Sequence, residues 1–162
     1  MRAVSLVVLA MLLPACAHYS TSATGGSGVR TVAVPLFENE SLEPEVHQAL
    51  TDSLIEAFVS DGALRVVDED RADAVLHGTI VEVKEEPFTY QAQAEQYRIV
   101  VFVDVTCQTI ENKTVLWEEK GLRGYGIYSA TERREEARAT GLAAAFRMLT
   151  KDIVDRTQVG GW

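Results

Sequence analysis

Basic and aromatic side chains gather in the second half of the sequence, near the ends of segments that alternate like strands. The candidate ligand-binding cations are Arg98, Lys120 and Arg123, and the aromatic residues close to them in the sequence are Tyr97, Tyr125 and Tyr128. Guanidinium and ammonium groups bind phosphates. If antiparallel pairing brings these residues together, they form a basic and aromatic rim that can meet phosphates and sugars. The alternative is a set of solvated charges on a sheet, which do little for binding or stability.

The stretch "RTVAVPLFENES", residues 30–41, has the order strand, loop, helix that many phosphate-binding sites share. Such a loop needs glycines, so that backbone N–H groups can close around the anion. This loop has no glycine, it loses one N–H at Pro35, and it carries the carboxylates of Glu38 and Glu40. The stretch therefore predicts a structural link between a strand and a helix, and not a phosphate site.

No arrangement typical of catalysis or metal binding occurs along the chain. The histidines, His18, His47 and His77, are not spaced as metal ligands on one helix face, and the segment "DEDRAD" lacks the glycine and closing glutamate of a calcium loop. No serine lies in a nucleophile-elbow motif. Neighbouring carboxylates such as Glu85 and Glu86 point to opposite faces of a strand. We expect no catalytic residues, no metal site and no cofactor, and therefore a protein that is not an enzyme.

The N-terminus has the pattern of an exported, lipid-anchored protein. Arg2 precedes an apolar run over residues 3–13, which is too short to span a bilayer, and "LPAC" ends the run at Cys16. We expect a signal peptide over residues 1–15, lipidation of Cys16, and a flexible tether over the glycine- and serine-rich residues 16–28. The alternative is an ordinary signal peptide with an unrelated cysteine. Ala17 replaces the aspartate that often retains lipoproteins in the inner membrane, which favours the outer membrane.

Composition and charge limit the number of domains and the kinds of ligand. The 162 residues are 47% hydrophobic and 24% charged, which predicts one globular domain over residues 29–162. Without Arg2, the 14 basic and 24 acidic side chains give a formal charge of −10, which argues against nucleic-acid binding. A polyanionic ligand must therefore be met by a local basic cluster. Once Cys16 is acylated, Cys107 has no partner within the chain and is expected to be a small buried apolar residue.

The first half of the domain predicts a strand, a helix and two further extended segments. The strand covers residues 31–36, and the helix covers about 44–60, where Val46, Leu50, Leu54 and Phe58 form one apolar stripe. Gly62 is expected to end the helix in a left-handed conformation. Residues 64–67 form a short extended piece. Residues 74–84 form a longer strand, with one face made by Val75, His77, Thr79, Val81 and Val83.

The second half predicts a hairpin and a final helix. One strand has a fully apolar face made by Ile99, Val101, Val103, Val105 and Cys107. A turn at 111–114 leads to a strand at 115–125, whose end is expected to be loosened by Gly121, Gly124 and Gly126. The last helix is expected to start near Ser129, which forms a capping-box pattern with Glu132, and to reach about Arg156.

These elements predict the α+β class, in the order β-α-β-β-β-α. A strand, a helix and a second strand favour parallel pairing, and the three later strands favour an antiparallel meander. Each helix has one apolar stripe, and the middle strand of the meander has one apolar face. We therefore expect a four-stranded mixed sheet with both helices packed on one face.

Several segments together carry a resemblance to a known family. The chain has, in order, "LPAC", "RTVAVPLFENES", "ALTDSLIEAF", "ADAVLHGTIVEVKEEPFTY", "YRIVVFVDVTC", "VLWEEKGLRGYGIY" and "EEARATGLAAAFRMLTKDIVDRT". This series resembles the LPS-assembly outer-membrane lipoprotein family (LptE type) over nearly the whole mature chain. Other periplasmic modules that open with a similar strand usually have a helix between the segments "LRVVD" and "ADAVLHG". Here only residues 68–73 lie between them, which favours the LPS-assembly family.

The resemblance implies a function without catalysis. Members of that family plug the large β-barrel LPS translocon of the outer membrane, support its assembly, bind lipopolysaccharide and help deliver it to the cell surface. The implied partners are therefore the outer-membrane barrel, lipopolysaccharide and, through the lipid anchor, the membrane. The alternative is a periplasmic lipoprotein scaffold of another envelope machine, such as a secretion channel.

Overall fold

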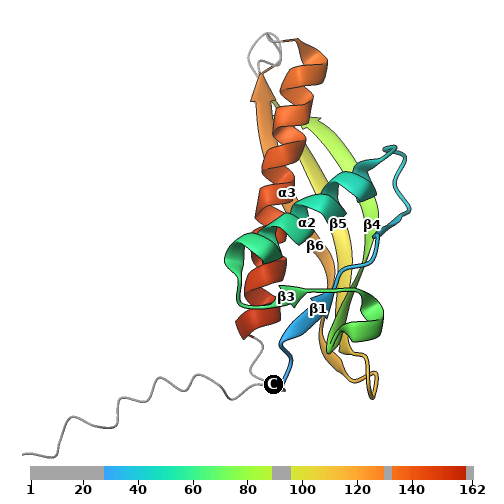
Figure 1. Ribbon diagram of the computed structural model, residues 1–162. Coiled ribbons are helices and arrows are strands. Elements are labelled where there is room, and N and C mark those ends of the chain that lie inside the picture. The colour runs from blue at the N-terminus through green and yellow to red at the C-terminus, as the bar shows by residue number, and fades with distance from the viewer. Residues whose placement is uncertain (1–27, 89–95, 130–132, 160–162) are drawn as a thin grey trace, which may run out of the picture.

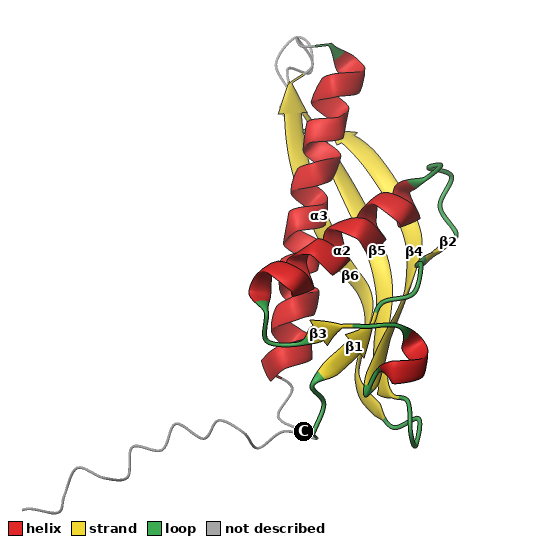
Figure 2. Ribbon diagram, in the orientation of Figure 1, coloured by secondary structure: helices red, strands yellow, loops and turns green. Residues whose placement is uncertain are grey.

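The computed structural model describes residues 28–88, 96–129 and 133–159, which form one mixed sheet and two long helices. Both helices lie against the same face of the sheet (Figures 1 and 2). The elements in chain order are β1 (Thr31–Ala33), β2 (Glu38–Asn39), α2 (Val46–Asp61), β3 (Arg65–Val66), the 3₁₀ turn η1 (Glu69–Arg71), β4 (Ala74–Pro87), β5 (Gln96–Thr109), β6 (Val115–Ser129) and α3 (Arg134–Val159). The α+β class and the placement of the helices on one face are confirmed. The predicted signal peptide, Cys16 and most of the tether lie outside the described residues.

The expected four-stranded sheet is wrong in its number of strands. The described sheet has six, in the order β3-β1-β4-β5-β6, with β2 paired to β4 beside the end of β1. β1 runs parallel to β3 and β4, and β4, β5 and β6 form the antiparallel meander, so the predicted pairing is confirmed. The two additional strands, β2 and β3, have two residues each. β3 falls within the extended piece expected at residues 64–67, whereas the two residues of β2 are too few to show an alternating pattern.

The core lies between the sheet and the two helices. Val46, Leu50, Leu54 and Phe58 of α2 are buried, as their four-residue spacing predicts. The apolar face of β5 is also confirmed, since its five members, Cys107 included, are all at most 1% exposed. From α3, Ala145, Phe146, Leu149, Ile153 and Val154 complete the core. α2 begins two residues after the expected Pro44, and Gly62 ends it at φ +76° with its N–H donating to the Phe58 carbonyl oxygen, 3.0 Å away.

A bulge in β4 makes the predicted face of that strand wrong. The register against β5 shifts between Ile80 and Glu82, so Val81 is an extra residue. Before the bulge, Leu76 and Ile80 face the core while His77 is exposed. After it, Val83 packs against the core. One extra residue exchanges the two faces of a strand, so Glu85 comes to face the helices and Glu86 faces the opposite side.

The glycines of β6 have a different role from the one expected. The strand continues to Ser129, and α3 packs directly on Gly124 and Gly126. A Cβ atom on Gly126 would lie 1.9 Å from the Gly141 carbonyl oxygen, and one on Gly124 would lie 2.2 Å from the Ala145 carbonyl oxygen. These glycines therefore allow helix and strand backbones to meet. The expected helix start near Ser129 is also wrong, because Ser129 ends β6 and α3 begins at Arg134.

Candidate functional site

The face of the sheet away from the helices, which we call the outer face, carries the candidate site. Ile99 and Val101 of β5 point into the core, and Gly124 and Gly126 of β6 contact α3. Because side chains alternate along a strand, the residues between them point to the outer face. β4 reaches the same face with its even-numbered residues after the bulge.

The strand register arranges these outer-face residues in three rows. Phe102 lies between Glu82 and Arg123, Val100 between Lys84 and Tyr125, and Arg98 between Glu86 and Ile127. All of these residues except Glu82 line a shallow concavity of about 390 Å³, whose lining residues are Lys84, Glu86, Phe88, Arg98, Val100, Phe102, Arg123, Tyr125 and Ile127. Its floor is apolar and aromatic, and three cations border it. The exposed large apolar residues of the chain include Phe88, Tyr125 and Ile127, each 38–46% exposed.

The three cations of the concavity differ in their partners. The Arg98 guanidinium lies 5.6 Å from the Phe88 ring centre, and its Nε donates to Glu86 Oε1 at 2.8 Å. Lys84 Nζ lies 5.3 Å from the Phe102 ring centre and 2.7 Å from Glu82 Oε2. Arg123 is exposed and forms no ion pair with any described residue. Cations held beside aromatic rings and an open arginine make a surface suited to an anion with an apolar body.

The predicted rim is therefore brought together only in part. Arg98, Arg123 and Tyr125 line the same concavity. Lys120 lies within a register shift between β5 and β6, and Glu118 is its partner at 3.4 Å. Tyr97 and Tyr128 are on the helix-covered face, stacked with ring centres 5.7 Å apart. Sequence reasoning missed Lys84, Phe88 and Phe102. Lys84 and Glu86 are two residues apart and so share a face of β4. That face could have been identified as the outer one only if the bulge in β4 had been known.

A second polar cluster ties α3 to the rest of the domain on the helix-covered face. Arg138 donates to both carboxylate oxygens of Glu43, at 2.7 and 3.0 Å, and to Glu85 at 3.0 Å, while Arg134 reaches Glu85 at 3.1 Å. Burial, followed by the neighbouring Glu85 carboxylate, raises the pKa of Tyr128 to about 12. Burial also tends to raise the pKa of Glu85, but the hydrogen bonds and charges around it bring that pKa below its usual value. The cluster is closed by its own ion pairs and is a structural tie.

Three further observations concern metal binding, membrane crossing and thiol chemistry in the described part of the chain. Within residues 28–88, 96–129 and 133–159, no three His, Cys, Asp or Glu side chains lie close enough to hold a metal ion. In the same ranges, neither long helix is apolar enough over a sufficient length to cross a membrane. Burial raises the pKa of the Cys107 thiol to about 12, so this cysteine is an unreactive core residue at neutral pH.

The described part of the chain is a small α+β domain, in which helices cover one sheet face and leave a cationic and aromatic surface on the other. The family model described as lipopolysaccharide-assembly, LptE, matches residues 29–157. The chain belongs to this family, which confirms the resemblance seen in the sequence. No curated protein matches the chain.

Solved structures with the same fold come from several bacteria. A protein from Xanthomonas campestris is 16% identical, with a TM-score of 0.60 over 81% of this chain and 85% of that chain. A hypothetical protein from Chlamydia trachomatis is 13% identical, with a TM-score of 0.58 over 82% and 98%. A minor lipoprotein from Acinetobacter baumannii is 8% identical, with a TM-score of 0.54 over 80% and 93%. At these identities the likeness shows the fold alone.

Proposed function

We propose that this chain is an outer-membrane lipoprotein, anchored through Cys16, that plugs and supports assembly of a β-barrel LPS translocon and helps deliver lipopolysaccharide to the cell surface. The observation that carries the proposal is the match to the lipopolysaccharide-assembly family over residues 29–157. The proposal includes no catalysis. Its partners are the barrel, lipopolysaccharide and the membrane that holds the lipid anchor.

The chemistry of the outer face supports lipopolysaccharide as the ligand. Lipopolysaccharide presents phosphorylated sugars joined to acyl chains, so its recognition requires cations beside apolar surface. Arg98, Arg123 and Lys84 supply the cations, and Val100, Phe102, Tyr125 and Ile127 supply the apolar surface. The chain carries a formal charge of −9, and its overall field repels a polyanion. A local cluster of this kind is therefore needed for phosphate binding.

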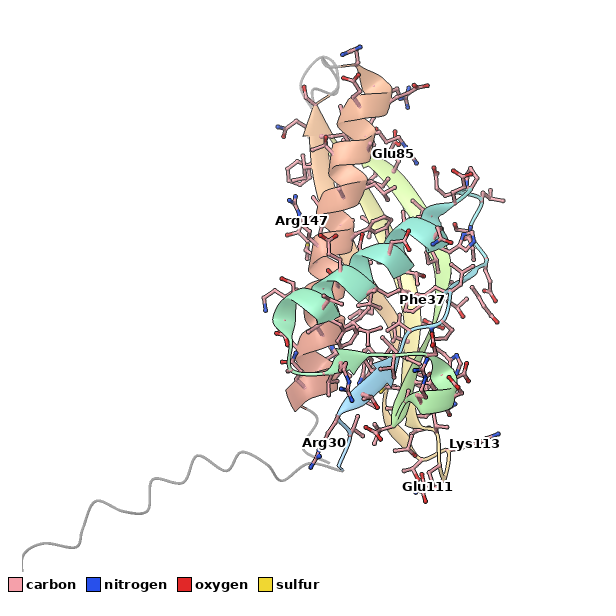
Figure 3. The ribbon with its side chains drawn as sticks, in the orientation of Figure 1. Arg30, Phe37, Glu85, Glu111, Lys113 and Arg147 are labelled. Carbon is pink, nitrogen blue, oxygen red and sulfur yellow. The ribbon has the colours of Figure 1, made fainter. Side chains whose placement is uncertain are left out.

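The position of the concavity also suits a protein anchored at its N-terminus. Arg30 lies at the same end of the domain as Glu111 and Lys113 of the β5–β6 turn, whereas Glu85 lies toward the other end (Figure 3). From Thr109 to Val100, β5 rises about 3.3 Å per residue, or about 30 Å. The chain thus enters at one end of the domain and presents the concavity far from it, as expected of an elongated plug that contacts its ligand away from its anchor.

Depletion and co-purification test the function. We expect depletion to reduce the lipopolysaccharide on the cell surface, and the protein purified from detergent-solubilised membranes to bring a large outer-membrane barrel with it. Purification with the components of a secretion channel and no such barrel would contradict the proposal. The double variant R98A/R123A should bind lipopolysaccharide at least about tenfold more weakly, since each charge-assisted contact contributes about 1.5–3 kcal/mol before its partial solvent exposure is counted. K120A is the matched control, because Lys120 lies outside the concavity.

A further inference from the structure

The Arg98 side chain already holds an anion, and that anion belongs to the protein. Glu86 and Arg98 are directly opposite each other on β4 and β5. Both Nε and Nη2 of Arg98 donate to the same carboxylate oxygen, Glu86 Oε1. This is the edge of the guanidinium that a phosphate oxygen would use. One of the two arginines of the concavity is therefore occupied by a carboxylate of the protein.

The contact between Arg98 and Glu86 is accessible to solvent. The Arg98 and Glu86 side chains are 40% and 48% exposed, so water reaches both and the carboxylate can turn to solvent without being buried alone. The Phe88 ring beside the guanidinium holds Arg98 in place by a contact that does not depend on Glu86. A phosphate monoester brings a charge between −1.5 and −2 and three acceptor oxygens, so it is a stronger partner for Arg98 than one carboxylate.

Neither of the other two cations of the concavity is paired with a carboxylate that lines it. Lys84 pairs with Glu82, which does not line the concavity, while Arg123 has no acidic partner among the described residues. Arg123 is therefore open to a ligand from the start. Glu86 is the carboxylate among the lining residues, and it occupies the arginine at the opposite side of the floor from Arg123.

We propose that Glu86 is a built-in competitor, which occupies Arg98 until a phosphorylated ligand displaces it and thereby lowers the affinity of the outer face. This inference rests on the proposed function, because it concerns the affinity of the same site. A carrier must release its ligand as well as bind it, and an internal carboxylate that returns to Arg98 favours release. Phosphate groups engage Arg123 first and then exchange with Glu86 at Arg98.

The test compares single carboxylate-to-amide changes in the full-length, lipidated protein in detergent. Binding of bisphosphorylated lipid A should be about two- to fivefold tighter for E86Q than for the wild type, which is the range that an exposed ion pair supplies. E118Q is the matched control, because Glu118 pairs with Lys120 outside the concavity. The affinity of the E118Q variant for lipid A should equal that of the wild type. The double variant E86Q/R98A should bind lipid A no more tightly than R98A alone. Equal or weaker binding by E86Q would mean that Glu86 positions Arg98 or does nothing, and would overturn the inference.

A second measurement separates the lipid headgroup from free phosphate. Titration with inorganic pyrophosphate, followed through the ¹⁵Nε signal of Arg98, should move that signal at a lower concentration in E86Q than in the wild type. If only lipid A shows the difference, displacement needs the apolar floor as well, and the inference holds for the lipid. If neither probe binds any variant, the inference is overturned. The proposed function is judged separately, by co-purification of the barrel.

Discussion

Replacing Gly126 with alanine tests whether the contact between α3 and β6 holds the domain together. The added Cβ would lie 1.9 Å from the Gly141 carbonyl oxygen, which is 1.1 Å inside the 3.0 Å that real Cβ atoms respect. The obstacle is backbone on both sides, so α3 must move away from the sheet. A gap of this size removes about a quarter to a half of the dispersion energy of the side chains beneath it. Further along the same helix, Phe146, Leu149 and Ile153 are fully or almost fully buried, and each contributes about 1.5–3 kcal/mol. We expect G126A to lower the free energy of unfolding by about 2–4 kcal/mol.

Urea unfolding followed by circular dichroism measures this loss, together with a fall in Tm of about 10 °C for a domain of this size. The matched control is G141A, at the other side of the same contact. Its Cβ would meet the Tyr128 and Ile99 side chains at 3.1 and 3.3 Å, a much smaller overlap than at Gly126, and alanine favours a helix more than glycine does by about 1 kcal/mol. G141A should therefore change stability by less than about 1 kcal/mol. A G126A variant as stable as the wild type would refute the close backbone contact.

Three further predictions concern other parts of the domain. Backbone hydrogen bonding from Arg30 and a hydrogen bond from the Thr31 hydroxyl lower the pKa of Asp73, so D73N should cost about 1 kcal/mol at pH 7. Since the pKa of Asp73 is lowered in the folded state, the stability difference between the wild type and D73N is complete well above pH 3.8. It should vanish as the pH falls through the folded-state pKa of Asp73, and urea unfolding at each pH measures it. R138Q leaves the Glu43 and Glu85 carboxylates without their shared partner and should cost about 1–2 kcal/mol, whereas R147Q, at an exposed arginine without an ion pair among the described residues, should cost nothing measurable. Because burial raises the thiol pKa of Cys107 to about 12, a thiol reagent should label it at pH 8 only after unfolding.

Elements with an uninterrupted period could be predicted from the sequence. The stripe of α2 and the apolar face of β5 repeat without a break, and both are buried as expected. β4 could not be predicted in the same way, because the extra residue at Val81 depends on pairing with β5 and leaves no local pattern. The glycines of β6 show the same limit: their spacing indicates flexibility when the strand is considered alone, and only the position of α3 shows why a side chain is excluded.

The residues of the candidate site could likewise be predicted only in part from the sequence. Arg98 and Arg123 were predicted together because their strands are consecutive and antiparallel, which brings the two residues to one face. Lys120 belongs to the same strand as Arg123, but a register shift and its Glu118 partner place it outside the concavity. Lys84 and Glu86 were missed as site residues because the bulge determines their direction. Their role depends on a contact across strands that composition and spacing do not contain.

Site-specific photo-crosslinking in living cells tests the central claim most directly. A photoreactive amino acid replaces Tyr125 on the outer face or, as the control, Ala143 on the exposed side of α3. Both positions are exposed, so a difference in crosslinking reports which face of the domain contacts lipopolysaccharide. We predict lipopolysaccharide adducts from position 125 and none from position 143. Adducts from position 143 alone, or from neither position while the protein still co-purifies with a barrel, would contradict the claim that the outer face of the sheet binds lipopolysaccharide.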